Sequence, residues 1–245
     1  MSAPASALAA TSAEIIVRLV GVEKHYRQGK IDVPALRGLD LEVRRGEFMA
    51  LTGPSGSGKT TALNIIGGLD KPSKGHVFVE GRDLATMSRT ELSRLRRDKI
   101  GFVFQAYNLV PVLTAFENAE MVLRLQGMPS HERHERITKL LDDVGLAGMH
   151  DRKPAEMSGG QQQRVAIARA IAPGPLVTLA DEPTANVDST TAEMLLSLME
   201  KLNRERGVTF IFSTHDPRVM ARARRIVRMV DGKIESDEIK PEIEG

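Results

Sequence analysis

The sequence predicts an α/β fold in which helices cover a mainly parallel sheet. Three observations carry this prediction. Short apolar runs rich in β-formers recur along the chain, helical patterns lie between several of them, and residues 114–172 read as helical almost throughout. Because alternating strands and helices favour a parallel sheet, we expect the long helical segment to be a subdomain inserted between two strands.

The expected strands are runs of β-branched, aromatic and other apolar residues. In chain order they are 15–22, 48–52, 77–79, 100–104, 176–180, 208–213 and 226–230. Helices are expected to begin near residue 61 and to span 164–171. Two further helices carry apolar residues at i, i+3, i+4 and i+7, the spacing of one helix face. These stripes are Ile137, Leu140, Leu141 and Val144, and Leu195, Leu198, Met199 and Leu202.

Length and composition predict one large domain or two small ones. The chain has 245 residues, of which 41% are hydrophobic and 27% charged, as is ordinary for a globular protein. We assign residues 14–235 to one domain. The Ala/Ser-rich residues 1–13 are expected to form a disordered leader, and the acidic residues 236–245 a flexible tail.

Composition also excludes several classes of function. The chain has no cysteine, which rules out disulfides, thiolate metal sites and cysteine nucleophiles. Its net charge of +2 gives no broad electrostatic footprint for nucleic acid. No apolar run approaches the ~18 residues that a membrane helix needs, and the first basic residue, Arg18, comes too late for a secretory signal. We therefore expect a cytoplasmic protein.

Residues 53–60 read Gly-Pro-Ser-Gly-Ser-Gly-Lys-Thr, a full match to G-x-x-x-x-G-K-[ST]. The glycines let backbone N–H groups converge on phosphates, Lys59 brings positive charge to the β and γ phosphates, and Thr60 offers a hydroxyl to Mg²⁺. A strand is expected before this loop and a helix after it, as in the phosphate-binding loop of nucleoside-triphosphate enzymes (the P-loop NTPase core). The residues expected to contact the nucleotide are Gly53, Pro54, Ser55, Gly56, Ser57, Gly58, Lys59, Thr60 and Thr61.

Further chemical groups follow two later strands. Asp181 and Glu182 come directly after 176–180, and His215 follows 208–213. Because neighbouring parallel strands bring their carboxyl ends to one edge, we expect these residues beside the phosphate loop. Asp181 is expected to hold Mg²⁺, Glu182 to orient or deprotonate an attacking water, and His215 to reach the γ-phosphate. Taken alone, the acidic pair could be a surface turn and the histidine a structural residue.

Residues 158–161 read Ser-Gly-Gly-Gln just before an expected helix, which provides a second helix N-terminus for an anion. Together with the phosphate loop and the Asp-Glu pair, this segment resembles the signature motif of the ATP-binding cassette (ABC) family. The resemblance extends from about residue 15 to 234. It implies an antiparallel β region near the N-terminus. It also implies that Ser158, Gly159, Gly160 and Gln161 bind nucleotide.

Three more positions match the family. Tyr26 matches the aromatic residue that stacks on adenine, although a lone tyrosine could equally pack in the core. Gln105, in Phe-Val-Phe-Gln, matches the glutamine that contacts Mg²⁺ and the attacking water. Asp188 matches the loop that links two sites across a dimer. That loop more often reads Ala-Leu-Asp, so Asn186 and Val187 are candidates for altered communication between the sites.

The resemblance implies a head-to-tail dimer in which the signature of one copy closes over ATP held by the other. It also implies a separate membrane permease, which would hold the protein at the inner face of the inner membrane. Residues 106–114 correspond to the permease-facing region, although plain packing between lobes is the alternative.

The amino-acid sequence of residues 104–118 and 179–189 resembles that of a subgroup of lipoprotein-releasing, macrolide- or peptide-exporting and cell-division cassettes. Members of that subgroup drive export or transmit motion across the membrane. The open alternatives are a signalling cassette that gates an extracytoplasmic enzyme, an importer cassette, and a non-transport ABC ATPase.

Overall fold

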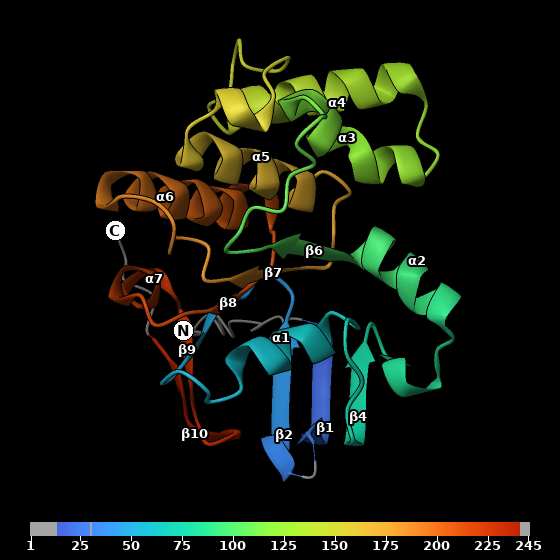
Figure 1. Cartoon of the computed structure of the whole chain (residues 1–245), viewed down its shortest axis with the longest axis vertical. Helices are drawn as coiled ribbons and strands as arrows, with labels where there is room; N and C mark the ends of the chain where they lie inside the picture. The colour runs from blue at the N-terminus through green and yellow to red at the C-terminus, as the bar shows by residue number, and fades with distance from the viewer. Residues whose placement is uncertain (1–13, 30, 241–245) are drawn as a thin grey trace, which may run out of the picture.

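Two sheets and several helices make up the computed structural model, which describes residues 14–29 and 31–240 (Figure 1). The larger sheet has the strand order β10-β9-β3-β8-β7-β6. Its members are β3 (Phe48–Thr52), β6 (Ile100–Val103), β7 (Val177–Asp181), β8 (Phe210–Ser213), β9 (Arg225–Val230) and β10 (Lys233–Ile239). All neighbours pair in parallel except β10, which is antiparallel to β9. The prediction of a mainly parallel sheet is confirmed.

The second sheet is antiparallel and lies near the N-terminus, as expected. Its order is β2-β1-β4-β5, with β1 (Ile15–Gln28), β2 (Ile31–Arg44), β4 (Lys74–Val79) and β5 (Arg82–Asp83). Strand β2 was not among the expected strands. This strand contains a proline, a glycine and several charged residues, and it buries only Leu36, Leu39, Leu41 and Val43. Register shifts along its pairing with β1 interrupt the alternation that reveals a strand.

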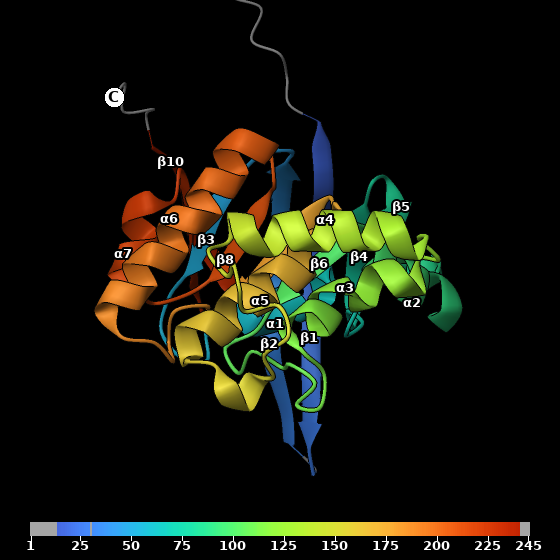
Figure 2. The same ribbon diagram turned by 90° about the horizontal axis from the view of Figure 1, so that it is seen from above.

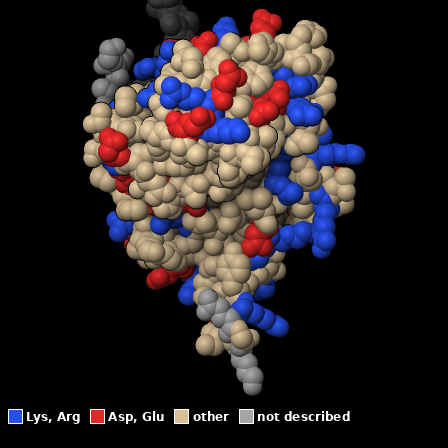
Figure 3. Space-filling view, turned by 45° about the horizontal axis from the view of Figure 1, so that its top comes forward, with Lys and Arg blue, Asp and Glu red and all other residues tan. Residues whose placement is uncertain are grey.

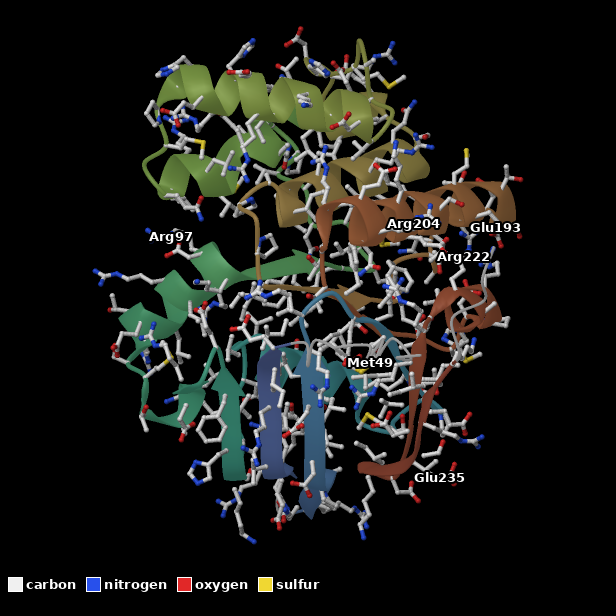
Figure 4. The ribbon with its side chains drawn as sticks, turned by 180° about the vertical axis from the view of Figure 1, so that it is seen from behind. Met49, Arg97, Glu193, Arg204, Arg222 and Glu235 are labelled. Atoms are coloured by element: carbon white, nitrogen blue, oxygen red, sulfur yellow. The ribbon has the colours of Figure 1, made fainter. Side chains whose placement is uncertain are left out.

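Helix α1 (Lys59–Ile66) lies between the two sheets (Figure 1). Strand β3 is buried on both faces, which explains its continuous apolar sequence. On one face, Met49 and Leu51 join the core that includes α1 and the antiparallel sheet. On the other, Phe48 and Ala50 join the core beneath the remaining helices. Figure 4 labels Met49 in the interior of the molecule.

The inserted helices form a lobe above the central sheet (Figures 1 and 2). This lobe contains α3 (Ala115–Leu125), α4 (Ser130–Asp143), the short 3-10 turn η2 (Pro154–Glu156) and α5 (Gly159–Ile171). The expected stripe of Ile137, Leu140, Leu141 and Val144 is buried. A second 3-10 turn, η1 (Leu84–Thr86), precedes α2 (Arg89–Lys99).

Helices α6 (Ser189–Arg206) and α7 (Pro217–Arg222) lie beside the lobe. An ion pair joins them, with Arg222 Nη2 2.7 Å from Glu193 Oε2 (Figure 4). The expected stripe on α6 is confirmed, because Leu195, Met199 and Leu202 are buried and Leu198 packs, partly buried, against the same core. Leu196 is buried as well and widens the stripe.

The expectation that residues 236–245 form a flexible tail is wrong for residues 236–239. These residues continue β10 and pair with β9. Arg225 of β9 stabilises the pairing, because its guanidinium contacts Asp237 on β10 at 2.7 Å and Glu47 before β3 at 3.0 Å. This strand was not predicted because only Ile234 and Ile239 of its seven residues are apolar. The expected leader, 1–13, and residues 241–245 lie outside the described residues.

The described helices include none that is both long and apolar enough to span a bilayer. On the face shown in Figure 3, acidic side chains lie among basic ones over the top of the molecule.

Candidate functional site

The carboxyl ends of β3, β7 and β8 meet at one edge of the central sheet, where they surround a cavity of about 660 Å³. The strand register brings these ends together, because Leu51 of β3 and Asp181 of β7 both pair with Ser213 of β8 in the parallel sheet. The residues that line the cavity are Tyr26, Ala35, Gly53, Pro54, Ser55, Gly56, Gly58, Lys59, Thr60, Thr61, Gln105, Glu182, Ala185, Ser213 and His215. The volume falls in the range of small-molecule and cofactor sites.

The loop between β3 and α1 needs its glycines. Gly53 has φ 139°, and a Cβ there would lie 2.0 Å from the carbonyl oxygen of Met229. Gly58 has φ 100°, and its Cβ would lie 2.6 Å from the carbonyl oxygen of Ala35. The positive φ angles and the close backbone contacts at both positions exclude any residue with a side chain. The loop backbone can therefore approach a ligand closely, and α1 begins directly after it.

Charges and hydroxyls at this edge fit a nucleotide and Mg²⁺. Lys59 Nζ donates to the carbonyl oxygens of Gly53 (2.8 Å) and Pro54 (3.0 Å), which holds its charge over the loop. Thr60 Oγ1 donates to the Asp181 carboxylate at 3.1 Å and 3.2 Å. Ser213 Oγ is buried at the cavity with no hydrogen-bond partner among the described residues. Hydroxyl and carboxylate oxygens are ligands that Mg²⁺ prefers.

Metal ligation by protein groups alone is not supported here. The described residues contain no cluster of three or more His, Asp or Glu side chains that could hold a metal ion. A single carboxylate and a hydroxyl suit Mg²⁺, which is commonly bound through one or two carboxylates together with substrate phosphates.

Glu182 and His215 form a pair, as the strand order predicts. His215 Nδ1 lies 2.7 Å from Glu182 Oε1, and Thr214 Oγ1 donates to Glu182 Oε2 at 3.1 Å. Since the carboxylate accepts at Nδ1, the other ring nitrogen of His215 remains available to a ligand. Glu182 has φ 43°, an unfavourable conformation for a residue with a side chain. Such strain concentrates at functional sites.

Tyr26 lines the cavity from β1 and is held by charged neighbours. Its hydroxyl donates to Asp70 Oδ2 at 2.8 Å, and Lys24 Nζ lies 4.9 Å from the ring centroid. Burial and the hydrogen bond to Asp70 raise the pKa of Tyr26. Burial alone would raise the pKa of Asp70, but hydrogen bonds from Lys24 and Tyr26 lower it. The ring is therefore fixed at the cavity rim.

Gln105 also lines the cavity, and its loop is held by polar contacts. Asn186 Nδ2 donates to the Gln105 carbonyl oxygen at 2.9 Å, and the Tyr107 hydroxyl donates to the Asn186 carbonyl oxygen at 3.0 Å. Arg169 of α5 donates to the carbonyl oxygens of Tyr107 (2.8 Å) and Asn108 (2.6 Å). Burial raises the pKa of Tyr107, which keeps its hydroxyl a donor.

The structure does not bring the Ser-Gly-Gly-Gln segment into this cavity. Ser158 caps α5, because its hydroxyl accepts from the backbone N–H of Gln161 at 3.3 Å while the Gln161 side chain accepts from the N–H of Ser158 at 2.9 Å. Gly160 packs against α6, where a Cβ would lie 2.3 Å from Thr191 Cγ2. The four residues 158–161 thus form a second helix N-terminus that is separate from the first.

Asp188 likewise lies outside the cavity and caps α6. Its carboxylate accepts from the Thr191 hydroxyl at 2.6 Å and from the Thr191 N–H at 2.9 Å. These hydrogen bonds lower the pKa of Asp188. In a single chain Asp188 has a local structural role.

Sequence reasoning missed several residues of the site. Ala35 and Ala185 line the cavity, but small residues give no chemical signal. Lys24 and Asp70 hold Tyr26, although 46 positions separate them. Thr214 could have been found, because it lies between the expected strand 208–213 and the expected site residue His215.

Comparisons with known proteins agree with this geometry. A sequence model of the ABC transporter family matches residues 36–185. The chain is 49% identical over 224 residues to the macrolide export ATP-binding/permease protein MacB of Syntrophobacter fumaroxidans, covering 91% of this chain and 31% of that protein. It is 47% identical over 221 residues to the lipoprotein-releasing system ATP-binding protein LolD 1 of Rhodopseudomonas palustris, covering 89% and 98%. The chain therefore spans about a third of the MacB relative but nearly all of the LolD relative.

A solved structure of an ATP-binding cassette also matches the fold of this chain. The cassette MJ0796 of Methanocaldococcus jannaschii, in a dimeric post-hydrolysis state bound to ADP and Pi, matches with a TM-score of 0.86. The two sequences are 44% identical, and the match covers 93% of this chain and all of the MJ0796 chain.

Proposed function

Because this chain belongs to the ABC transporter family and is an ATPase, we propose that two copies close over ATP and power a separate membrane permease. One observation carries the proposal. The cavity holds the phosphate loop, Glu182 and His215, while the Ser158–Gln161 turn lies elsewhere in the same chain. A second copy in head-to-tail orientation would place its turn over the cavity, and MJ0796 is a dimer in its solved structures.

In this proposal the two helix N-termini hold ATP from opposite sides. The loop from Gly53 to Thr61 and the start of α1 bind the phosphates, with Lys59 at the β and γ positions. The start of α5 from the second copy faces the γ-phosphate. Loss of that phosphate on hydrolysis removes the charge which α5 was binding, so the dimer opens. This opening is the mechanical output.

Each side chain at the sheet edge then has a distinct role. Glu182 takes a proton from the attacking water or orients it, and His215 contacts the γ-phosphate. Tyr26 stacks on the adenine. Mg²⁺, when bound, neutralises charge on the β and γ phosphates. The residues that would hold this ion are Thr60, Asp181 and Gln105.

A second groove supports docking of the permease. A cavity of about 360 Å³ lies between α2, β6, α3 and α5, next to the Gln105 loop. Its lining combines apolar side chains with arginines, including Leu69, Phe104, Met121, Arg97 and Arg169. Figure 4 labels Arg97, which α2 contributes to this groove. A groove lined by apolar side chains and arginines suits an amphipathic helix.

We further propose a permease of the lipoprotein-release or macrolide-export type, with this protein at the inner face of the membrane. The LolD and MacB relatives support this subgroup through the names they carry. In this type of system the cassette drives export or transmits motion, and the permease selects the substrate.

Purification of a tagged Glu182→Gln variant in mild detergent with ATP tests the proposal, with mass spectrometry to identify what accompanies it. The matched control is Lys59→Ala, which should not form the ATP-bound dimer. A partner with few membrane spans and a large extracytoplasmic domain, retained only by Glu182→Gln, is the expected result. A many-span permease would point to conventional transport. A soluble partner, or none beside a stable ATP-bound dimer, would contradict the proposal.

A further inference from the structure

Two loops at the edge of the ATP cavity are joined by a reciprocal pair of hydrogen bonds. One loop follows β6 and contains Gln105 and Tyr107, and the other follows β7 and contains Asn186. The Asn186 side chain donates to the Gln105 backbone (2.9 Å), while the Tyr107 side chain donates to the Asn186 backbone (3.0 Å). The bonds run in opposite directions between the same loops, so neither loop can move far without breaking one of them.

The start of α5 packs against this pair. A Cβ on Gly159 would lie 2.8 Å from the Tyr107 hydroxyl and 3.6 Å from the Asn186 carbonyl oxygen. Further along the same helix, Arg169 donates to the carbonyl oxygens of Tyr107 and Asn108. The Gln105 loop is therefore held by the Asn186 loop on one side and by the signature helix on the other.

The Gln105 loop also needs to be held. Tyr107 has φ 55° and Asn108 has φ 50°, two successive positive values in residues that carry side chains. Asparagine tolerates this conformation, but it is unfavourable for tyrosine and persists where surrounding contacts enforce it. Side-chain contacts from Asn186 and Arg169 hold this loop, together with backbone hydrogen bonds from Tyr107 to Phe104 and from Asn108 to Ala106.

We propose that Asn186 and Tyr107 are positioning residues that hold Gln105 at the ATP cavity and couple it to the signature turn. The inference rests on the proposed function, because it describes how the permease groove controls that site. Asn108 and Arg169 line the groove, whereas Gln105 lines the ATP cavity. Movement of the loop by the permease would displace Gln105 directly.

The same movement would reach the dimer interface. It would pass through Asn186 to the loop that ends at Asp188, and through Tyr107 to Gly159. Asn186 stands where the family more often has alanine, which cannot make the bond to Gln105. The Asn186 half of this link therefore depends on the asparagine side chain of this chain.

The test uses the full chain with Asn186→Ala, Tyr107→Phe and the double variant. Thr86→Val is the matched control, because it removes a side chain-to-backbone hydrogen bond of 2.9 Å at an exposed turn that does not line the cavity. Two measurements are made. One is hydrogen–deuterium exchange over residues 104–109 and 158–161 without nucleotide, and the other is kcat and KM for ATP.

Each single variant should raise exchange in both segments and lower kcat by about two- to tenfold, the factor that one ordinary hydrogen bond supplies. KM should change by less than about twofold, since ATP binding relies on other residues. The fall in kcat of the double variant should be no greater than the larger of the two single-variant falls, because the two hydrogen bonds act as a unit.

Exchange equal to that of the Thr86→Val control would overturn the link between the loops. The positioning role would be overturned if exchange rises but the kcat losses of the two single variants add up in the double variant. It would also be overturned if only KM changes. If the unmodified chain hydrolyses no ATP, the proposed function fails, and the exchange result still decides whether the link exists.

Discussion

Replacement of Glu182 by glutamine separates chemistry from binding at this site. The side chain keeps its length and shape but loses its negative charge and its ability to accept a proton. Its present contacts are modest, with His215 Nδ1 at 2.7 Å and the Thr214 hydroxyl at 3.1 Å. A glutamine oxygen can still accept from His215, and Thr214 can reverse its role, because a hydroxyl both donates and accepts.

The structure therefore predicts a large kinetic effect and a small effect on stability. Loss of a positioned general base lowers kcat by about 10²- to 10⁴-fold, or about 3 to 5 kcal/mol in the activation free energy at 1.36 kcal/mol per factor of ten. One rearranged hydrogen bond changes the free energy of unfolding by about 1 kcal/mol or less. ATP affinity should be retained, because Lys59 and the phosphate loop are unchanged.

Three measurements on the purified variant check this: steady-state ATP hydrolysis, the Kd for ATP, and urea unfolding. The control is Glu205→Gln, which removes the same charge from an exposed position on α6 and should leave all three values unchanged. Hydrolysis by Glu182→Gln at the unmodified rate would refute its assignment as the base. A loss of activity matched by an equal loss of stability would show that the effect is structural.

Three further predictions concern other parts of the molecule. Lys59→Ala should raise the Kd for ATP at least about tenfold, because a phosphate contact to a charged group is lost; unchanged affinity would count against its role. Leu141→Ala should lower the free energy of unfolding by about 2 to 5 kcal/mol in urea, since Leu141 is fully buried in the helical lobe; a cost below about 1 kcal/mol would show that the lobe is loosely packed. Asp216→Asn should be destabilising near neutral pH. Hydrogen bonds from Arg218 lower the pKa of Asp216 from 3.8 to about 2, a difference of about 2 kcal/mol that solvent screening reduces to about 1–2 kcal/mol. Since the folded-state pKa is depressed, this stabilisation is present above about pH 4 and is lost as the pH falls toward about 2. A constant difference between the two proteins over that range, measured by urea unfolding, would contradict the ion-pair origin.

The parts of the fold that could be predicted from sequence are those in which local pattern and burial agree. Strand β3 is buried on both faces, so four of its five residues are apolar and it is easily recognised. Strand β2 could not be found in this way, because register shifts interrupt its alternation and five of its 14 residues are charged. The end of β10 was missed because Asp237 pairs with Arg225 across the sheet, a contact that the sequence alone does not reveal.

The candidate site likewise contains residues that local sequence predicts and contacts that it does not predict. Contiguous motifs predicted the phosphate loop, the Asp181–Glu182 pair and His215, and strand topology explained why they meet. The contacts that position these groups join distant segments. Tyr107 and Asn186 are 79 residues apart, and neither carries a signal that names the other as its partner.

The central claim is that ATP joins two copies of this chain through the Ser158–Gln161 turn. Sedimentation velocity on Glu182→Gln with and without ATP tests it most directly, with Glu182→Gln combined with Ser158→Arg as the control. The account predicts a monomer without ATP, a dimer with saturating ATP, and a monomer under both conditions for the double variant. A Glu182→Gln monomer at saturating ATP, or a dimer that forms regardless of ATP and of Ser158, would contradict it.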